Sequence, residues 1–273
     1  MDDSEPCSHT TEQRLSSWEE FQQCAAAFED PTRKRYDEVW FRDQSDARWP
    51  LHTSLERRLT NTRAVSEYLN LISEIRPAVE TFTDSLFSMP GRLEIELACR
   101  DTRMLIDDRL RGCATYLAHL RHGGFPSPLL DWTHSPYVAA YFAFHHARHD
   151  GDVAIYAYRE WTSTLKVGGS DAARIVSFGP IFRTHKRHFR QQSRYTSCVK
   201  FEGGQWFFAP HDEVFGQKNH FKQDLLWKMT IPAKERLKVL RFCDKVNLNE
   251  FTLFDSEEGL LEMQAMRVFD LRP

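Results

Sequence analysis

Residues 122–144 read HGGFPSPLLDWTHSPYVAAYFAF, which joins a glycine stop, a polar turn and an apolar helix. Gly123-Gly124 ends the helical pattern that precedes it. The turn Asp131–Ser135 opens an aromatic-rich segment, and Pro136 suits a first helical turn because its missing N–H has no partner there in any case. We therefore predict a helix over residues 135–147, with Asp131 as one candidate for its N-cap.

The chain before this stretch reads as mostly helical, and the chain after it as rich in strands. Helical periodicity appears at residues 18–28 and through much of 55–120, with breaks expected at Pro77 and at Pro90-Gly91. The predicted strands are 36–42, 153–158, 195–201, 205–209 and 225–231, and the later helices are 234–244 and 257–266. Helices first and strands later predict an α+β fold, with a hairpin at Glu202-Gly203-Gly204.

Composition predicts one folded domain over residues 13–273, after a disordered acidic segment over 1–12. Of the 273 residues, 41% are hydrophobic and 27% charged, and no apolar run approaches the ~20 residues of a membrane helix. The first residues lack a signal-peptide pattern. The six cysteines form no Cys-x-x-Cys pair, so we expect reduced thiols and no metal site in a cytoplasmic protein without membrane contact.

Charge is distributed unevenly along the chain. Residues 1–30 contain eight acids and one base, whereas 171–202 contain seven bases between two terminal acids. Such a basic stretch favours an anionic partner, so we predict nucleic-acid contact there. The residues assigned to it are Arg183, Lys186, Arg187, Arg190 and Arg194. The alternatives are a basic stretch covered by the acidic N-terminus and a merely solvated face.

Two segments carry a family resemblance. Residues 40–55 (WFRDQSDARWPLHTSL) and 122–144 resemble the two signatures of the FRG (Phe-Arg-Gly) domain family, with Leu129–Thr133 intact. Asp43 stands where the family has glycine, and Ser127-Pro128 replaces Thr-Arg. Weaker matches lie at 187–196, 228–234 and 252–254, so the resemblance extends over about residues 36–262.

The order of an aromatic-Arg strand, a Ser/Thr motif with a helix and a Gln/Glu strand resembles the arginine–serine–glutamate mono-ADP-ribosyltransferases. That resemblance implies a split mixed sheet, a helical insertion at about 55–120 and NAD as substrate. It implies a catalytic set of Arg42, Thr133, Ser135, Gln191 and Glu202. It implies NAD-binding residues Phe41, Arg42, Gln44, Asp131, Trp132, Tyr141 and Phe142.

Several of these roles have open alternatives. Arg42 is suited to the NAD pyrophosphate because its planar fork binds oxyanions, but a salt bridge to Asp43 or Asp46 is the structural alternative. Tyr141 and Phe142 are also typical core residues. The third catalytic position is open: Gln191 or Gln192 matches the family's glutamine motif, whereas a developing cation favours a carboxylate, Glu202 or Glu213.

Three functions compete on this evidence. The first is an NAD-dependent mono-ADP-ribosyltransferase, a toxin of a bacterial toxin–antitoxin or phage-defence system. It would modify RNA, DNA or a protein and require a neutralising partner protein. The second is a non-catalytic nucleic-acid or nucleotide-binding module. The third is a metal-dependent nuclease with ligands among Asp131, Glu202, Asp212 and Glu213. No Rossmann, Walker-type or Gly-x-Ser-x-Gly motif is present.

Overall fold

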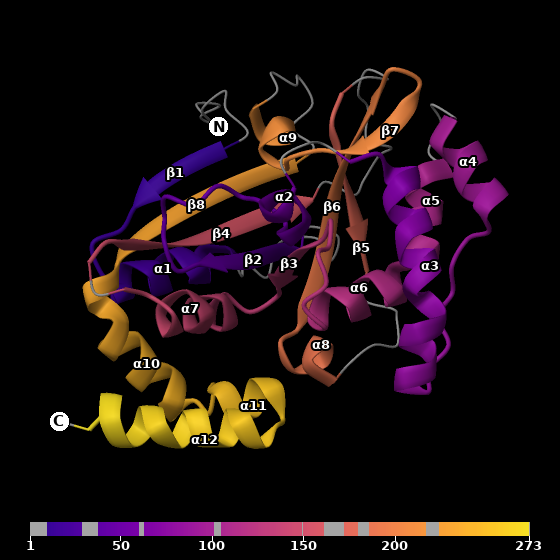
Figure 1. Ribbon diagram of the computed structural model, residues 1–273. Coiled ribbons are helices and arrows are strands. Elements are labelled where there is room, and N and C mark those ends of the chain that lie inside the picture. The colour runs from indigo at the N-terminus through magenta and orange to yellow at the C-terminus, as the bar shows by residue number, and fades with distance from the viewer. Residues whose placement is uncertain are drawn as a thin grey trace.

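The computed structural model describes residues 10–28, 38–59, 63–100, 105–148, 150–160, 172–179, 186–216 and 224–272. Their strands form one mixed sheet in the order β1-β8-β4-β2-β3-β6-β5, with β7 paired to β6 (Figure 1). Only β1 and β8 are parallel. The strands are β1 (Thr10–Arg14), β2 (Val39–Gln44), β3 (Leu130–Thr133), β4 (Asp152–Glu160), β5 (Arg174–Phe178), β6 (Ser193–Glu202), β7 (Gln205–Phe208) and β8 (Asp224–Pro232).

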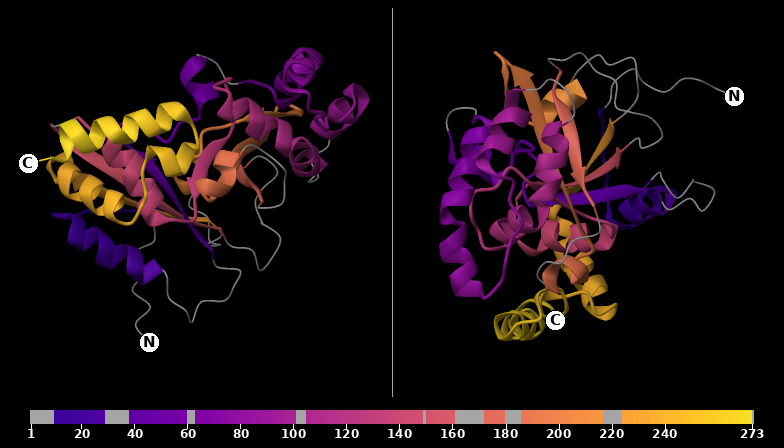
Figure 2. Two further views of the ribbon diagram at one scale, coloured as in Figure 1. Left: turned by 90° about the horizontal axis from the view of Figure 1, so that it is seen from below. Right: turned by 90° about the vertical axis from the view of Figure 1, so that its right-hand side faces the viewer.

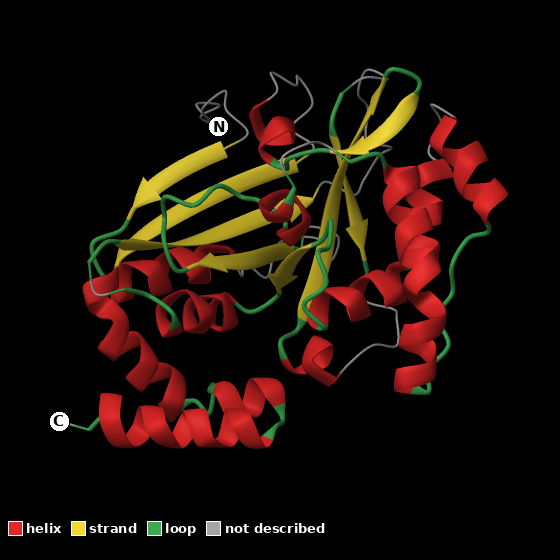
Figure 3. Cartoon of the chain, in the orientation of Figure 1, coloured by secondary structure: helices red, strands yellow, loops and turns green. Residues whose placement is uncertain are grey.

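The sheet has a narrow joint between β2 and β3. These strands share the single pair Phe41↔Thr133, whereas β2 pairs with β4 from Val39 to Gln44. The strands diverge on either side of the joint, so the sheet forms two arms (Figures 1 and 3). One arm contains β1, β8, β4 and β2, and the other contains β3, β6, β5 and β7.

Helices cover the two arms separately (Figure 2). The helices are α1 (Trp18–Phe28), α2 (Ser54–Arg58), α3 (Val65–Thr83), α4 (Arg92–Arg100), α5 (Leu105–Gly112), α6 (Ala114–His122), α7 (Pro136–His145), α8 (Lys186–Arg190), α9 (Asp212–Gly216), α10 (Arg236–Lys245), α11 (Glu250–Phe254) and α12 (Glu257–Ala265). A 3-10 turn, η1 (Ala233–Glu235), precedes α10, and a π-helical turn, η2 (Met266–Asp270), follows α12. Helices α1, α7 and α10 share a core with the first arm, and α3–α6 share one with the second. The α+β prediction is therefore confirmed.

The helix at the centre of the molecule follows the sequence prediction closely. Pro136 begins α7, and the Ser135 hydroxyl accepts from the Val138 N–H at 3.3 Å. Ser135 is thus the N-cap, and Asp131 lies earlier, in β3. The helix is apolar all round because it lies between the sheet on one side and α10 and α11 on the other.

Three local predictions need correction. Pro77 does not break α3, since it lies on an exposed side where water can bond the carbonyl left without an N–H donor. The helical pattern predicted between Pro90-Gly91 and residue 120 is divided among three helices, α4, α5 and α6. Residues 10–12, expected to be disordered, pair with β8 as part of β1, while residues 1–9 lie outside the described residues.

Candidate polar site at the β2–β3 joint

Arg42 lies at the joint because it follows Phe41, which pairs with Thr133 of β3; on its other side it lies opposite Tyr156 of β4. The residue is 8% exposed, and its Nη1 donates to the main-chain carbonyl of Asp131 at 2.8 Å. Its Nε is buried without a hydrogen-bond partner, and burial lowers the pKa of the guanidinium. The alternative of a salt bridge to Asp46 is not present, because Asp46 pairs with Arg48 at 2.6 Å.

Asp131 extends the site to α6. Its Oδ2 accepts from Nε of Arg121 at 2.8 Å and lies 2.5 Å from Nη2 of the same guanidinium, whereas its Oδ1 is buried without a partner. Burial acts to raise the pKa of Asp131, but the charges of Arg121 and then Arg42 outweigh it and hold the pKa below its ordinary value. Asp131 is therefore an anion held between two arginines.

Asp43 approaches Asp131 across the joint. Two residues beyond the Phe41↔Thr133 pair, the antiparallel register would place Asp43 opposite Asp131, where the strands have parted. Burial raises the pKa of Asp43; the charge of Asp131 adds to the rise, and the charge of Arg42 opposes it. The position that departs from the family's glycine thus brings a second carboxylate into the site.

Arg57 adds a third guanidinium from α2. A capping box of Thr53 and Glu56 begins this helix, and the Leu55 N–H donates to the carbonyl of Ser127 at 3.1 Å. The Arg57 side chain is exposed, and its Nη1 donates to the carbonyl of His52 at 3.2 Å. Burial is the main cause that lowers the pKa of Arg42, and the charges of Arg121 and Arg57 add to it. Arg57 and Arg121 were missed by the sequence analysis, because neither stands in a residue pattern that points to β3.

The Gln191-Gln192 segment contacts the turn Thr133–Ser135 through its main-chain carbonyls. The Thr133 hydroxyl donates to the Gln191 carbonyl at 2.7 Å and accepts from the Ser135 N–H at 3.1 Å. The His134 N–H donates to the carbonyl of Gln192, whose φ of 49° is left-handed. The hydroxyls of Thr133 and Ser135, which were predicted to bind NAD, thus stabilise the turn between β3 and α7. The bond from Thr133 also places Gln191 at the end of β3.

A histidine–tyrosine group lies beside this site. Tyr195 on β6 pairs with Asp131, and its hydroxyl lies 2.8 Å from Nε2 of His122 and 3.1 Å from Nδ1 of His188. Burial lowers the pKa of His188 to about 4 and raises that of Tyr195. The scattered spacing of the histidines in the sequence gave no indication of this arrangement.

Other predicted residues lie elsewhere. Glu202 is exposed at the β6–β7 hairpin, where it lies 3.6 Å from Lys200. It is six positions along β6 from Thr196, which faces Leu130, and six positions of a strand span about 20 Å. The expected approach of Glu202 to Arg42 is therefore absent. Glu213 also lies 3.6 Å from Lys200, on α9.

Most of the expected NAD-contacting aromatic residues are core residues. Phe41, Trp132 and Tyr141 are at most 2% exposed. The Tyr141 hydroxyl donates to Glu250, and Phe142 packs edge-on against Phe254. Gln44 bonds the Pro50 carbonyl and the Tyr156 hydroxyl, which fixes the turn after β2. Their positions are explained by packing and by support of the turn.

The residues of the basic stretch contact an aspartate, an aromatic ring and a main-chain carbonyl. Lys186 and Arg190 both pair with Asp255, at 3.6 and 3.0 Å, and Arg187 lies over the ring of Phe254. Arg194 on β6 donates to the carbonyl of Ser193. Arg183 lies outside the described residues. The described members of the predicted nucleic-acid surface thus each have a contact within the protein, although the Lys186 side chain is 79% exposed, and contact with nucleic acid stays a prediction.

No group of three or more His, Cys, Asp or Glu side chains in the described residues could hold a metal ion. No helix among them is long and apolar enough to cross a membrane. No disulfide bond joins the described cysteines.

One family model matches the segment of the chain that contains this site. The model of the FRG domain family matches residues 37–152, less than half of the 273-residue chain, and this match supports the FRG resemblance. The matched segment contains β2, β3 and α7 and all three arginines of the joint. No curated protein matches the chain significantly. No solved structure does so either.

Proposed function

We propose that this FRG-like chain is an NAD-dependent mono-ADP-ribosyltransferase with its site at the β2–β3 joint. The observation that carries the proposal is that Arg42 and Arg121 both bond Asp131, while the charge of Arg57 acts on the same groups. The expected split of the sheet, in the manner of the ADP-ribosyltransferases, belongs to the same proposal. Its support is the single residue pair that joins the two arms.

The joint suits a pyrophosphate in charge and in donor chemistry. The charges of three arginines, Arg42, Arg57 and Arg121, act there beside those of two carboxylates, Asp43 and Asp131. Guanidinium groups bind phosphate oxygens through paired N–H donors, and a buried donor without a partner favours a ligand that supplies an acceptor. Nε of Arg42 is such a donor.

The reaction transfers the ADP-ribosyl group to a nucleophile. The bond between C1′ of the ribose and the nicotinamide nitrogen breaks, nicotinamide leaves neutral with the bonding electrons, and the acceptor forms a bond to C1′ and loses a proton. Positive charge develops on the ribose, and a nearby carboxylate stabilises it. We assign this role to Asp43, since Glu202 is distant and Asp131 is held by Arg121.

The wider role follows from this chemistry as a proposal. A cytoplasmic enzyme that consumes NAD and modifies RNA, DNA or protein would be toxic to its own cell. We therefore propose a toxin of a bacterial toxin–antitoxin or phage-defence system, controlled by a neutralising partner protein.

A second candidate is a non-catalytic nucleotide-binding module. The position of Glu202 favours it, because that residue does not bring the expected carboxylate to Arg42. Such a module would bind the same diphosphate through the three arginines without breaking the glycosidic bond.

Incubation with labelled NAD and cell lysate, with the protein, RNA and DNA fractions separated, tests the first candidate. We expect label in one fraction and nicotinamide release, both lost in Arg42→Ala. ADP-ribose binding without nicotinamide release would replace the first candidate with the second. Absence of both label and ADP-ribose binding in a folded protein would contradict both.

A further inference from the structure

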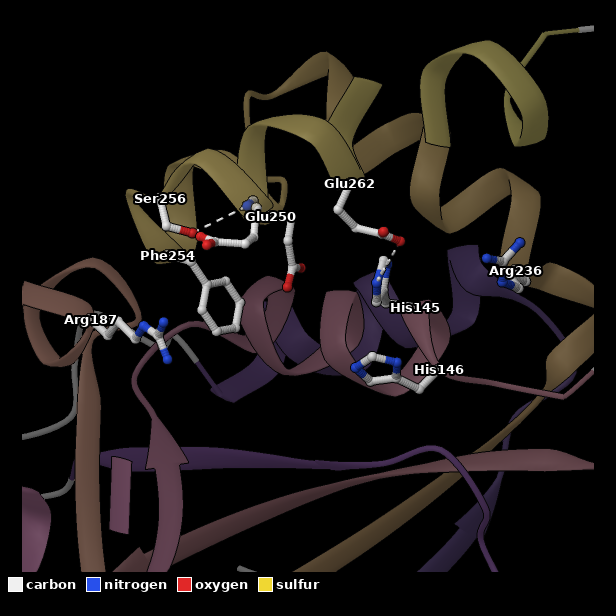
Figure 4. A pocket seen from close by; sticks show the side chains of 10 residues that line it. His145, His146, Arg187, Arg236, Glu250, Phe254, Ser256 and Glu262 are labelled. Atoms are coloured by element: carbon white, nitrogen blue, oxygen red, sulfur yellow. Dashed lines mark hydrogen bonds and ion pairs between the residues drawn. The ribbon is translucent and has the colours of Figure 1, made fainter. Parts of the chain in front are cut away.

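A separate pocket lies between α7 and the α11–α12 hairpin, on the side of α7 away from the sheet (Figure 4). Its volume is about 570 Å³. The residues that matter for its chemistry come from α7, α8, α11 and α12; they are His145, Arg187, Glu250, Phe254, Glu258 and Glu262. The proposed transfer reaction uses none of them.

Three glutamates and two arginines line this pocket, and one of the arginines, Arg236, already pairs with an aspartate. Glu250, Glu258 and Glu262 line the pocket, and the C-terminus of α7 adds a partial negative charge. Burial raises the pKa of Glu250, and the charge of Glu262 adds to the rise. Arg236 at the pocket wall is engaged with Asp270 at 3.2 Å. A cationic ligand would therefore relieve repulsion between acids.

One wall already holds a guanidinium. The Arg187 side chain lies 4.7 Å from the centre of the Phe254 ring, and its charge opposes the rise in the pKa of Glu250 that burial causes. An arginine on an aromatic face beside carboxylates is a stable arrangement. The opposite wall, at Glu262, has no arginine or lysine within ion-pair distance among the described residues.

His145 provides the second observation. Its side chain is 8% exposed, and its Nδ1 is buried without a hydrogen-bond partner. Its Nε2 lies 3.7 Å from Glu262, too far for a hydrogen bond. Burial keeps the ring neutral by lowering its pKa to about 4. A neutral imidazole has one acceptor nitrogen, so His145 and Glu262 together present acceptors to a ligand with several N–H donors.

We propose that this pocket binds a guanidinium group of the kind carried by an arginine side chain, placed between Glu250 and Glu262 and opposite Arg187. The planar group has five N–H donors in a fixed fork, which suits two carboxylates and an imidazole better than a compact ammonium does. This inference is independent of the proposed transfer reaction.

Calorimetric titration of the full chain with L-arginine amide tests the proposal, with citrulline amide as the uncharged isostere and lysine amide as the ammonium counterpart. We expect arginine amide to bind at least about tenfold more tightly than either. Glu262→Gln should weaken binding by about tenfold or more, whereas Glu257→Gln, on the same helix but outside the pocket lining, should not. A short peptide with one arginine separates the sources: tighter binding of the peptide indicates a polypeptide ligand, and equal binding a free guanidinium compound.

Equal binding of citrulline amide, equal binding of lysine amide, or no effect of Glu262→Gln would each overturn the proposal. So would the absence of binding at millimolar arginine amide. Circular dichroism of each variant shows that it is folded. Because the readout is binding and not NAD turnover, failure of the transferase proposal leaves this test unaffected.

Discussion

Arg121 of α6 and Asp131 of β3 form an ion pair with two short contacts to one oxygen, Nε–Oδ2 at 2.8 Å and Nη2–Oδ2 at 2.5 Å. The pair links the helical half of the chain to the strand that ends at the β2–β3 joint. Arg42 bonds the main-chain carbonyl of the same aspartate. One residue thus anchors two arginines that the sequence separates widely.

Substitution of Arg121 tests both stability and ligand binding. Arg121→Gln should lower the free energy of unfolding by about 1–2 kcal/mol, less than for a fully buried pair because the Asp131 side chain is 36% exposed. It should also weaken ADP-ribose binding by at least about tenfold. Chemical denaturation and calorimetry measure the two effects. Arg92→Gln, which breaks the exposed pair with Glu96, is the control and should change neither.

Arg121→Gln should also change how the free energy of unfolding depends on pH in acid. The folded pKa of Asp131 is lowered, so its contribution is present above the unfolded value of about 3.9 and is lost as pH falls through the folded value. The stability of the wild type should therefore fall more steeply below about pH 4 than that of Arg121→Gln. Parallel curves for the two proteins would contradict the assignment.

Substitutions of Asp43 and of Glu202 test which of the two carboxylates stabilises the charge on the ribose. Asp43→Asn should reduce nicotinamide release by about 100-fold or more, because it removes charge beside the reacting ribose. Glu202→Gln should leave the rate unchanged, since that side chain is exposed at the hairpin. Loss of turnover in Glu202→Gln with normal turnover in Asp43→Asn would reverse the assignment.

His145 should make the protein sensitive to mild acid. Burial lowers its folded pKa to about 4, below the unfolded value of about 6.5, so protonation favours the unfolded chain. Its effect is absent above about pH 6.5 and grows as pH falls to about 4, with an upper limit of about 3 kcal/mol. His145→Phe keeps a ring against Tyr141 and should flatten the stability curve in this window. Thermal melts across the window measure it.

Gly259 allows α11 and α12 to approach closely. A Cβ there would lie 2.9 Å from the Glu250 carbonyl oxygen, so Gly259→Ala should destabilise the protein by about 1–3 kcal/mol. Gly112→Ala is the control, because nothing lies within 4 Å of a Cβ at that position. Equal melting temperatures for the two variants would show that the hairpin adjusts without cost.

The sequence by itself determined the local elements. Apolar periodicity located α1, Pro136 located the start of α7, and Gly203-Gly204 located the β6–β7 hairpin, because these signals act within a few residues. Two motif segments also indicated the FRG resemblance, which the family match over residues 37–152 supports.

The tertiary structure decided the partners of these residues. The contacts of Arg121 and Arg42 with Asp131 and the separation of Glu202 from Arg42 depend on strand order and register, which bring together residues far apart in the chain. The periodicity of apolar residues along the chain does not specify that register. The same reason explains why Tyr141 is a core residue and why Asp43 meets a second carboxylate at the joint.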